Sequence, residues 1–258
     1  ARWRRVRVGG ALGEHGKHRA LVIRPALTFS GAILSAAFAS TAEAACRLAL
    51  ILAMDVSSSV SDEEYRLQQT GLAAALMSED VLNAILDTRE GYVSLAIYEW
   101  SGRNQQSLIL DWHELIDRFA VAAAAGTILQ SKRSFSKFPT SMGFSLGYGV
   151  GLYKNGPRCD RRVMDVSGDG INNDGFGPQI AYQHFPFDDV TVNGLVIVGS
   201  DPEVEEFYER EVLKGRFAFL EVAQGFDDFE RAMSRKLFRE ISNLMVGQAP
   251  RQMRESKS

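Results

Sequence analysis

The chain has 258 residues, of which 45% are hydrophobic and 24% charged, and it contains 23 Gly, 7 Pro and 2 Cys. These values are close to the average of globular proteins, so they argue against a disordered, collagen-like or coiled-coil chain and against a small disulfide scaffold. The length allows one or two domains, and one α/β domain of about 200 residues already buries a large core.

The charge is distributed unevenly along the chain. Residues 1–44 carry seven basic and two acidic residues, a net charge of +5, which leaves 22 basic and 30 acidic residues, net −8, in residues 45–258. An acidic body without a basic stripe gives no support for nucleic-acid binding, because that binding depends on neutralising phosphates.

The first 44 residues have the three parts of a secretory signal peptide. Basic residues up to Arg24 are followed by a 14-residue apolar run at 26–39 and by the small-residue site Ala42-Glu43-Ala44. The run is shorter than the roughly 20 residues that a membrane-spanning helix needs. We therefore expect residues 1–44 to be a cleaved signal peptide and the protein to be periplasmic or secreted. A buried helix or an uncleaved anchor is the alternative.

The rest of the chain alternates between apolar runs and amphipathic segments. Residues 47–54 are almost wholly apolar, which predicts a strand buried on both faces. Ser61 and Glu64 form a capping box that predicts the start of a helix reaching about residue 86. Further strands are expected at 92–99, 107–112, 162–167, 190–199 and 216–222, and further helices at 113–125, 140–153, 177–185, 202–213 and from 229 to about 244.

Six strands alternating with helices predict a doubly wound α/β fold. The sheet is expected to be open, mostly parallel and covered by helices on both faces. Glycines in the 140–153 helix give it a bare face for close packing on the sheet. No linker indicates a second domain, so we expect a single domain at 45–246 and a flexible tail at 247–258.

A set of oxygen-bearing side chains follows the expected strand ends. The first strand ends in a D-x-S-x-S pattern, Asp55, Ser57 and Ser59. A later strand ends just before Asp169, which lies between two glycines, and Thr140 opens the glycine-rich helix. Ligands of such sheets bind outside the carboxyl ends of the strands. Hard oxygen ligands without His or Cys favour Mg²⁺, with Mn²⁺ or Ca²⁺ as alternatives, over zinc or copper.

Taken singly, each of these motifs is more commonly a turn or a helix N-cap than a ligand. Their conjunction is specific, and on it residues 47–246 resemble a von Willebrand factor type A domain. The resemblance implies a six-stranded sheet with one antiparallel edge strand and a divalent cation bridged to an Asp or Glu of a protein partner. Residues 163–170 are similar to a bacterial exported branch of the family without an assigned biochemical role. The implied metal ligands are Asp55, Ser57 and Ser59 in the first loop, Thr140 in the second and Asp169 in the third.

The chain departs from the family pattern at two positions. The third motif reads Gly168-Asp169-Gly170 where Thr-Asp-Gly is usual. Met142 stands where the second motif commonly has another threonine, and a thioether is not a ligand for a hard cation. Ser141 is the candidate substitute on that loop.

The resemblance also bears on the two cysteines. Cys46 lies nine residues before Asp55, and Cys159 lies ten before Asp169. The family's strand order makes the two strands neighbours, which puts both cysteines at the opposite edge of the sheet and within reach of a disulfide. We expect a Cys46–Cys159 bridge in an exported protein. Two buried free thiols are the alternative.

The main enzymatic alternative is a haloacid-dehalogenase-like phosphohydrolase with Asp55 as nucleophile. Residues 168–174 come within one inserted Asn of that family's G-D-G-x-N-D motif. The first motif of that family has an acid two residues after the nucleophile, where this chain has Ser57, and a serine cannot act as that acid. A serine hydrolase is disfavoured because residues 45–258 contain only two histidines, His113 and His184, to serve as the base of a catalytic triad.

Two further charged features have simple interpretations. Asp165 lies in an apolar strand and needs a partner that the sequence does not name. The basic run of the last helix is interpreted as its solvated face. That run comprises Arg231, Arg235, Lys236 and Arg239.

We therefore expect an exported protein that captures a protein partner through a divalent cation, without catalysis. No nucleic-acid partner is expected, and no membrane span after removal of the signal peptide. A structural scaffold with an unused metal site is the remaining alternative.

Overall fold

The apolar run at residues 47–54 is the central strand of the fold. The computed structural model describes residues 45–87, 89, 91–199 and 201–242, and in it this run becomes β1, Cys46–Asp55. All ten residues of β1 are buried because it has a parallel neighbour on each side and a layer of helices on each face. The predicted signal peptide at 1–44 and the predicted tail at 247–258 lie outside the described residues.

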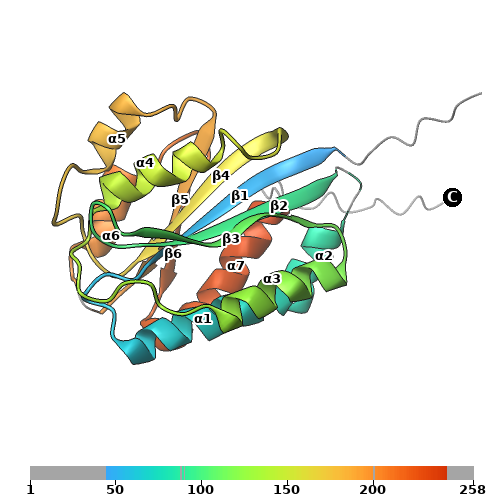
Figure 1. Cartoon of the computed structure of the whole chain (residues 1–258), viewed down its shortest axis with the longest axis horizontal. Helices are drawn as coiled ribbons and strands as arrows, with labels where there is room; N and C mark the ends of the chain where they lie inside the picture. The colour runs from blue at the N-terminus through green and yellow to red at the C-terminus, as the bar shows by residue number, and fades with distance from the viewer. Residues whose placement is uncertain (1–44, 88, 90, 200, 243–258) are drawn as a thin grey trace, which may run out of the picture. The chain divides into compact units, whose positions relative to one another are not determined.

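The strands form one six-stranded sheet, ordered β3-β2-β1-β4-β5-β6. Only the edge strand β3 is antiparallel to its neighbour, as expected. In Figure 1, β1 and β4 run side by side toward the lower left, where the loops that follow them meet. The remaining strands are β2 (Tyr92–Trp100), β3 (Gln106–Leu115), β4 (Cys159–Gly168), β5 (Val190–Ile197) and β6 (Leu220–Ala223).

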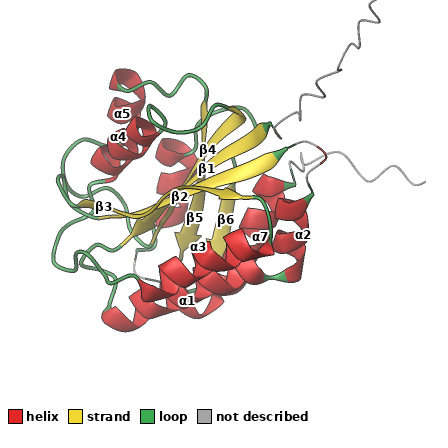
Figure 2. Cartoon of the chain, turned by 45° about the vertical axis from the view of Figure 1, so that its right-hand side comes forward, coloured by secondary structure: helices red, strands yellow, loops and turns green. Residues whose placement is uncertain are grey.

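Helices cover both faces of the sheet, which confirms the doubly wound prediction (Figure 2). Alternate residues of β1 point to opposite layers: Leu50 packs on one side and Ile51 on the other. The first layer contains α1 (Asp62–Met77), α2 (Glu79–Leu86), α3 (Arg118–Gln130) and α7 (Phe229–Ile241). The second layer contains α4 (Met142–Leu152), α5 (Pro178–His184), α6 (Val204–Phe207) and the π-helical turn Tyr208–Val212.

Several element boundaries differ from the sequence prediction. The capping box of Ser61 and Glu64 begins α1 as expected, but the helix breaks at Ser78, whose extended backbone (ψ 144°) starts α2. β3 continues to Leu115, and α3 begins after the N-cap Asp117 instead of at 113. β6 has only four residues, Leu220–Ala223, and begins four positions later than the strand expected at 216–222. Position 244 lies outside the described residues.

The glycines of α4 permit the close packing that the sequence predicted. A Cβ atom at Gly149 would come within 2.7 Å of the Tyr98 hydroxyl on β2 and 2.8 Å of the Met164 side chain on β4. The helix therefore approaches the sheet more closely than a side chain at this position allows. None of the helices in the described ranges is long and apolar enough to cross a membrane.

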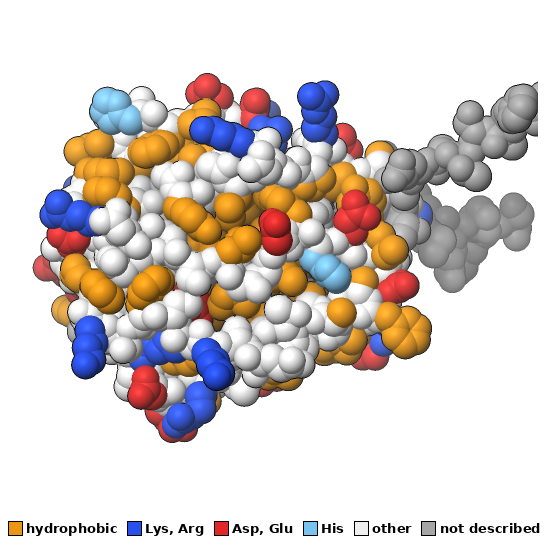
Figure 3. All heavy atoms as spheres, viewed as in Figure 1, with side chains coloured by type: hydrophobic (Ala, Val, Ile, Leu, Met, Phe, Trp, Pro, Cys, Tyr) orange, Lys and Arg blue, Asp and Glu red, His pale blue; other side chains and the backbone are white. Residues whose placement is uncertain are grey.

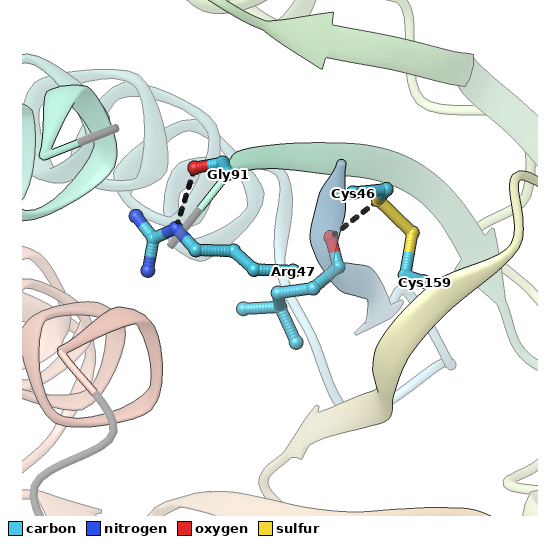
Figure 4. The surroundings of a disulfide bond; sticks show 5 residues. Cys46, Arg47, Gly91 and Cys159 are labelled. Carbon is cyan, nitrogen blue, oxygen red and sulfur yellow. Dashed lines mark hydrogen bonds between the residues drawn. A yellow bond between two sulfur atoms is a disulfide. The ribbon is translucent and has the colours of Figure 1, made fainter. Parts of the chain in front are cut away.

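The expected disulfide joins Cys46 to Cys159 (Figure 4). These residues are register partners at the start of β1 and β4, and their Cα atoms are 4.5 Å apart. The bond encloses 113 sequence steps, so loop entropy alone would stabilise the fold by up to about 4 to 5 kcal/mol. Next to it, Arg47 donates a hydrogen bond of 3.0 Å to the carbonyl of Gly91.

The interpretation of the last helix as a solvated basic face is wrong for Lys236. This side chain is fully buried and forms ion pairs with Asp165 of β4 and, at 2.9 Å, with Glu240. Burial and the Glu240 charge raise the pKa of Asp165 well above its usual range. Burial lowers the pKa of Lys236, but the two carboxylates outweigh this effect and raise it. Lys236 is thus the partner that Asp165 needs.

Removal of Lys236 should destabilise the fold strongly. In Lys236→Ala, two buried carboxyl groups lose their cation, and we expect the free energy of unfolding to fall by about 3 to 5 kcal/mol. Arg235→Ala is the matched control, because its neighbouring, half-exposed side chain makes a surface ion pair with Glu221 and a long hydrogen bond of 3.5 Å to the Val222 carbonyl, and a loss below about 1 kcal/mol is expected. Urea denaturation measures both values. Equal losses would show that the buried cluster does not hold α7 on the sheet.

Candidate functional site

The five predicted ligands lie together at the carboxyl edge of the sheet. Asp55 ends β1, Asp169 follows β4, and Thr140 precedes α4. Their hydroxyl groups form a chain: Thr140 donates to Ser57 (3.2 Å), Ser57 and Ser59 share a hydrogen bond (3.1 Å), and Ser59 donates to Asp169 Oδ1 (2.8 Å). The backbone N–H of Ser57 donates to Asp55 Oδ1 at 2.7 Å. The structure therefore brings all five residues into one cluster.

The cluster has only one accessible member. Asp55 and Ser57 are fully buried, Asp169 and Thr140 nearly so, whereas Ser59 is exposed. A ligand that reaches the carboxylates from solvent therefore approaches past Ser59 and its exposed neighbour Ser58.

Protein donors compensate the negative charge of the cluster only in part, at the Oδ1 atom of each carboxylate. The Oδ2 atoms of Asp55 and Asp169 are buried without a hydrogen-bond partner. Burial, and then the charge of Asp169, raise the pKa of Asp55 to about 7. A divalent cation would neutralise both carboxylates, and the three hydroxyls add oxygen ligands without adding charge. The donor set therefore fits a hard divalent cation.

Tyr208 contributes a third unpartnered polar atom. Its hydroxyl is buried without a hydrogen-bond partner, and burial together with the charges of Asp55 and Asp169 raises its pKa. A Cβ atom at Gly168 would lie 2.7 Å from this hydroxyl oxygen and 2.9 Å from Asp55 Oδ2. Gly168 stands where the family usually has Thr, so Tyr208 fills the space that the threonine side chain would occupy.

Arg133 holds the first loop in place. Its Nη2 atom donates to the carbonyls of Val56 (3.2 Å), Ser57 (3.1 Å) and Val60 (2.6 Å), and its Nη1 atom pairs with Asp62 (2.9 Å). Sequence reasoning missed this residue. It lies more than 70 positions after the loop that it binds, and no local motif marks it.

The segment after Asp169 positions the second loop. The side-chain oxygen of Asn173 accepts a hydrogen bond from the Thr140 N–H at 2.9 Å, and the backbone N–H of Asn173 donates to the Thr140 carbonyl at 3.0 Å. The side-chain oxygen of Asn172 accepts from the Met142 N–H at 2.8 Å. The asparagines that the sequence suggested as part of a phosphohydrolase motif therefore hold the second loop.

Ser141 and Met142 have other roles than metal ligation. The Ser141 hydroxyl donates to Asp174 at 2.6 Å instead of joining the cluster, so it is not the substitute ligand that was considered. Met142 is fully buried in the core of the α4 layer. Trp100 is also fully buried, below the same edge of the sheet. Among the described residues, no group of three or more His, Cys, Asp or Glu side chains is placed to bind a metal, which sets this two-carboxylate site apart from such centres.

The same fold occurs in solved structures of von Willebrand factor type A proteins. Proximal thread matrix protein 1 from the mussel byssus has a TM-score of 0.56 at 15% identity, over 76% of this chain and 47% of that one. A further structure of that protein has a zinc-occupied MIDAS motif (TM-score 0.52, 14% identity, 77% and 47% coverage). The pilus adhesin SpaC from Lactobacillus rhamnosus GG has a TM-score of 0.56 at 14% identity, over 77% of this chain and 30% of that one.

A von Willebrand factor type A protein from Catenulispora acidiphila matches with a TM-score of 0.54 at 14% identity, over 77% of this chain and 42% of that chain. The chain thus spans less than half the length of each of these proteins. At such identities the likeness shows the fold, and the described domain has the fold of a von Willebrand factor type A domain. The oxygen ligands were expected to disfavour zinc. The zinc-occupied MIDAS motif shows that this expectation does not hold for every protein with this fold.

The sequence itself identifies the family. The profile of the family described as "Protein of unknown function (DUF1194)" matches residues 45–245, and the chain belongs to this family. No match is found among curated proteins.

Loss of the Asp55 charge should stabilise the metal-free protein at high pH. The pKa of Asp55 is raised to about 7 from an ordinary value of 3.8, so the native state binds this proton more tightly than the unfolded chain. The free energy of unfolding should therefore fall by up to about 4 kcal/mol between pH 4 and pH 7, and Asp55→Asn should lack that part of the fall. Urea denaturation in metal-free buffer at pH 4, 5 and 8 measures the difference. Identical pH dependence in both proteins would contradict an uncompensated buried charge.

Proposed function

We propose that this protein is an exported adhesion-type module that binds a protein partner through a divalent cation. The observation that carries the proposal is the pair of buried, unpartnered carboxylate oxygens on Asp55 and Asp169, next to three linked hydroxyl groups. Mg²⁺ is the proposed ion, with Mn²⁺ or Ca²⁺ as alternatives. The metal ligands are Asp55, Ser57, Ser59, Thr140 and Asp169, directly or through water.

The chemistry of the site favours binding of a carboxylate. Two carboxylates neutralise the charge of a divalent ion, while the hydroxyl ligands leave it electrophilic. An Asp or Glu of the partner can then complete the coordination from the exposed Ser59 side. Related folds in a pilus adhesin and a byssus matrix protein support an adhesive role.

The surface beside the first loop suits an acidic partner. The segment 131–138 carries three basic residues and no acidic one, and Lys132, Lys137 and Phe138 are exposed. A recess of about 390 Å³ is lined by Asp62 and residues 133–138. In Figure 3, Lys and Arg side chains gather at the lower left, toward the start of α1 and the chain between α3 and α4. Such a surface attracts a partner whose metal-binding carboxylate lies among other acidic groups.

The hydrogen bonds of Ser57 argue against the phosphohydrolase alternative. The hydroxyl at the position of that family's catalytic acid is linked to Thr140 and Ser59, and it cannot protonate a leaving group. The Cys46–Cys159 disulfide supports an exported protein, because such bonds persist in oxidising compartments.

Metal binding is tested by calorimetric titration of the purified protein with Mg²⁺, Mn²⁺ and Ca²⁺. We expect saturable binding of one ion, lost in Asp169→Ala because half of the compensating charge is gone. Asp188→Ala removes an exposed carboxylate before β5 and should bind as the parent does. Binding that survives Asp169→Ala would place the metal elsewhere.

Partner capture is tested with the immobilised protein and an envelope extract of the source cells. Capture should require Mg²⁺, disappear in chelator and disappear in Asp55→Ala. Amidation of the carboxyl groups in the extract with a carbodiimide should also abolish capture, because the bridging Asp or Glu is then neutral. Capture that persists in chelator would refute the metal bridge, and capture that persists after amidation would refute the carboxylate.

A further inference from the structure

A second recess lies at the opposite edge of the sheet from the candidate metal site. It has a volume of about 390 Å³ and lies between the starts of β4 and β5, the segment before β6 and the end of α7. Val163 of β4 lines it, and six residues of extended strand, roughly 20 Å, separate Val163 from Asp169. The recess is therefore distinct from the candidate metal site.

Arginine side chains outnumber acidic ones in the lining of this recess, four to three. Arg161, Arg216 and Arg239 line it from three different elements of the chain. A fourth, Arg162, borders the recess, but its guanidinium lies over the Tyr153 ring, 5.8 Å from the centroid. This concentration of positive charge contrasts with the net charge of −8 over residues 45–258.

Two of these arginines have no carboxylate partner in the described part of the chain. No ion pair within 4.0 Å joins Arg216 or Arg239 to an acidic side chain there. Glu240, which also lines the recess, is already bound by Lys236 and by Asn193 at 2.8 Å. The lining acids Asp160 and Asp189 are exposed to solvent. The guanidinium groups therefore remain available to an anion.

Aromatic rings hold these guanidinium groups in place. Arg239 stacks on Phe219, 3.7 Å from the ring centroid, and Arg216 lies 4.7 Å from the centroid of Phe217. Stacking on the flat face of a guanidinium leaves its edge N–H groups free for bidentate binding of a carboxylate or phosphate. The recess thus combines fixed donors with apolar surface.

The backbone of Phe217, which lines the recess, has an unusual conformation. Phe217 has a φ of 68° and is the only non-glycine residue with a positive φ in the described ranges. This conformation is unfavourable for a bulky residue, and such positions concentrate at ligand sites. The side chain is 57% exposed, so burial of Phe217 in the core does not account for the conformation.

We propose that this recess binds a small organic anion with a carboxylate or phosphate group and an apolar part. Arg216 and Arg239 bind the oxyanion, and the exposed Phe217 ring contacts the apolar part. The volume lies within the range of small-molecule sites. The site works independently of the divalent cation.

The test uses phenyl phosphate and phenylacetate as probes, with sodium chloride at matched ionic strength as the blank. Calorimetry and thermal unfolding should show saturable binding of at least one aromatic anion, and the tighter probe identifies the oxyanion. The double variant Arg216→Gln/Arg239→Gln should bind at least tenfold more weakly. Arg158→Gln/Arg235→Gln, which removes two exposed arginines outside the recess, should bind as the parent does.

Two further measurements test whether binding is independent of the metal site and whether a loss of binding reflects unfolding of the variant. Binding should persist in Asp55→Ala in buffer freed of metal by a chelating resin, and binding lost there would overturn the assignment. Arg216→Gln alone changes an exposed side chain and shows the loss if the double variant does not fold. No saturable binding of either probe, or equal binding by the double variant, would also overturn the proposal.

Discussion

The parallel pairing of β1 with β4 is the interaction on which the rest of the structure depends. Its register joins Cys46 to Cys159 at one end and pairs Met54 with Ser167 at the other. The chains leave these neighbouring strands at Asp55 and Asp169. A slip of one residue would separate the cysteines and turn alternate side chains to the wrong layer. The covalent bond at one edge therefore fixes the relative height of the two carboxylates at the other.

Two buried carboxylates, Asp165 within β4 and Asp169 directly after it, have different surroundings. Asp165 meets Glu240, and this pair receives an internal cation, Lys236. Asp169 meets Asp55, and here the described residues supply hydroxyl groups and a backbone N–H but no cation in ion-pair contact. A fold that neutralises the first pair and leaves the second open is one in which the second pair is available for a cation from solution. This contrast is the structural reason to prefer a used metal site over an inert scaffold.

The sheet and the site could be predicted because both depend on residues that form short, local sequence patterns. A fully apolar run marked β1, and a carboxylate directly after it marked the carboxyl edge of the sheet. Asp55 and Asp169 could be placed together because parallel strands end at one edge. Arg133 and Lys236 could not be found in this way. Each makes its contacts across 70 or more positions, with Val60 and Asp165, and an arginine or lysine in a basic segment looks solvent-exposed until the fold is known.

The structure shows what occupies the surroundings of each departure from the family pattern. Gly168 leaves room for the Tyr208 hydroxyl beside Asp55 Oδ2, so a polar group from a different element occupies the place of the missing threonine side chain. Ser141, freed from ligation, binds Asp174.

A third acid, Asp174, lies beside the second loop, where it accepts the hydrogen bond from Ser141. Arg103 pairs with it through two nitrogens, and the hydrogen bonds from Arg103 and Ser141 lower its pKa to about 2. This third acid is therefore ionised but neutralised by its own arginine. Asp55 and Asp169 are then the two carboxylates of the proposed metal site, and their combined charge of −2 would match a divalent ion. A third free carboxylate would give the occupied site a negative charge and repel an acidic partner, so the Arg103–Asp174 pair keeps the site receptive to one.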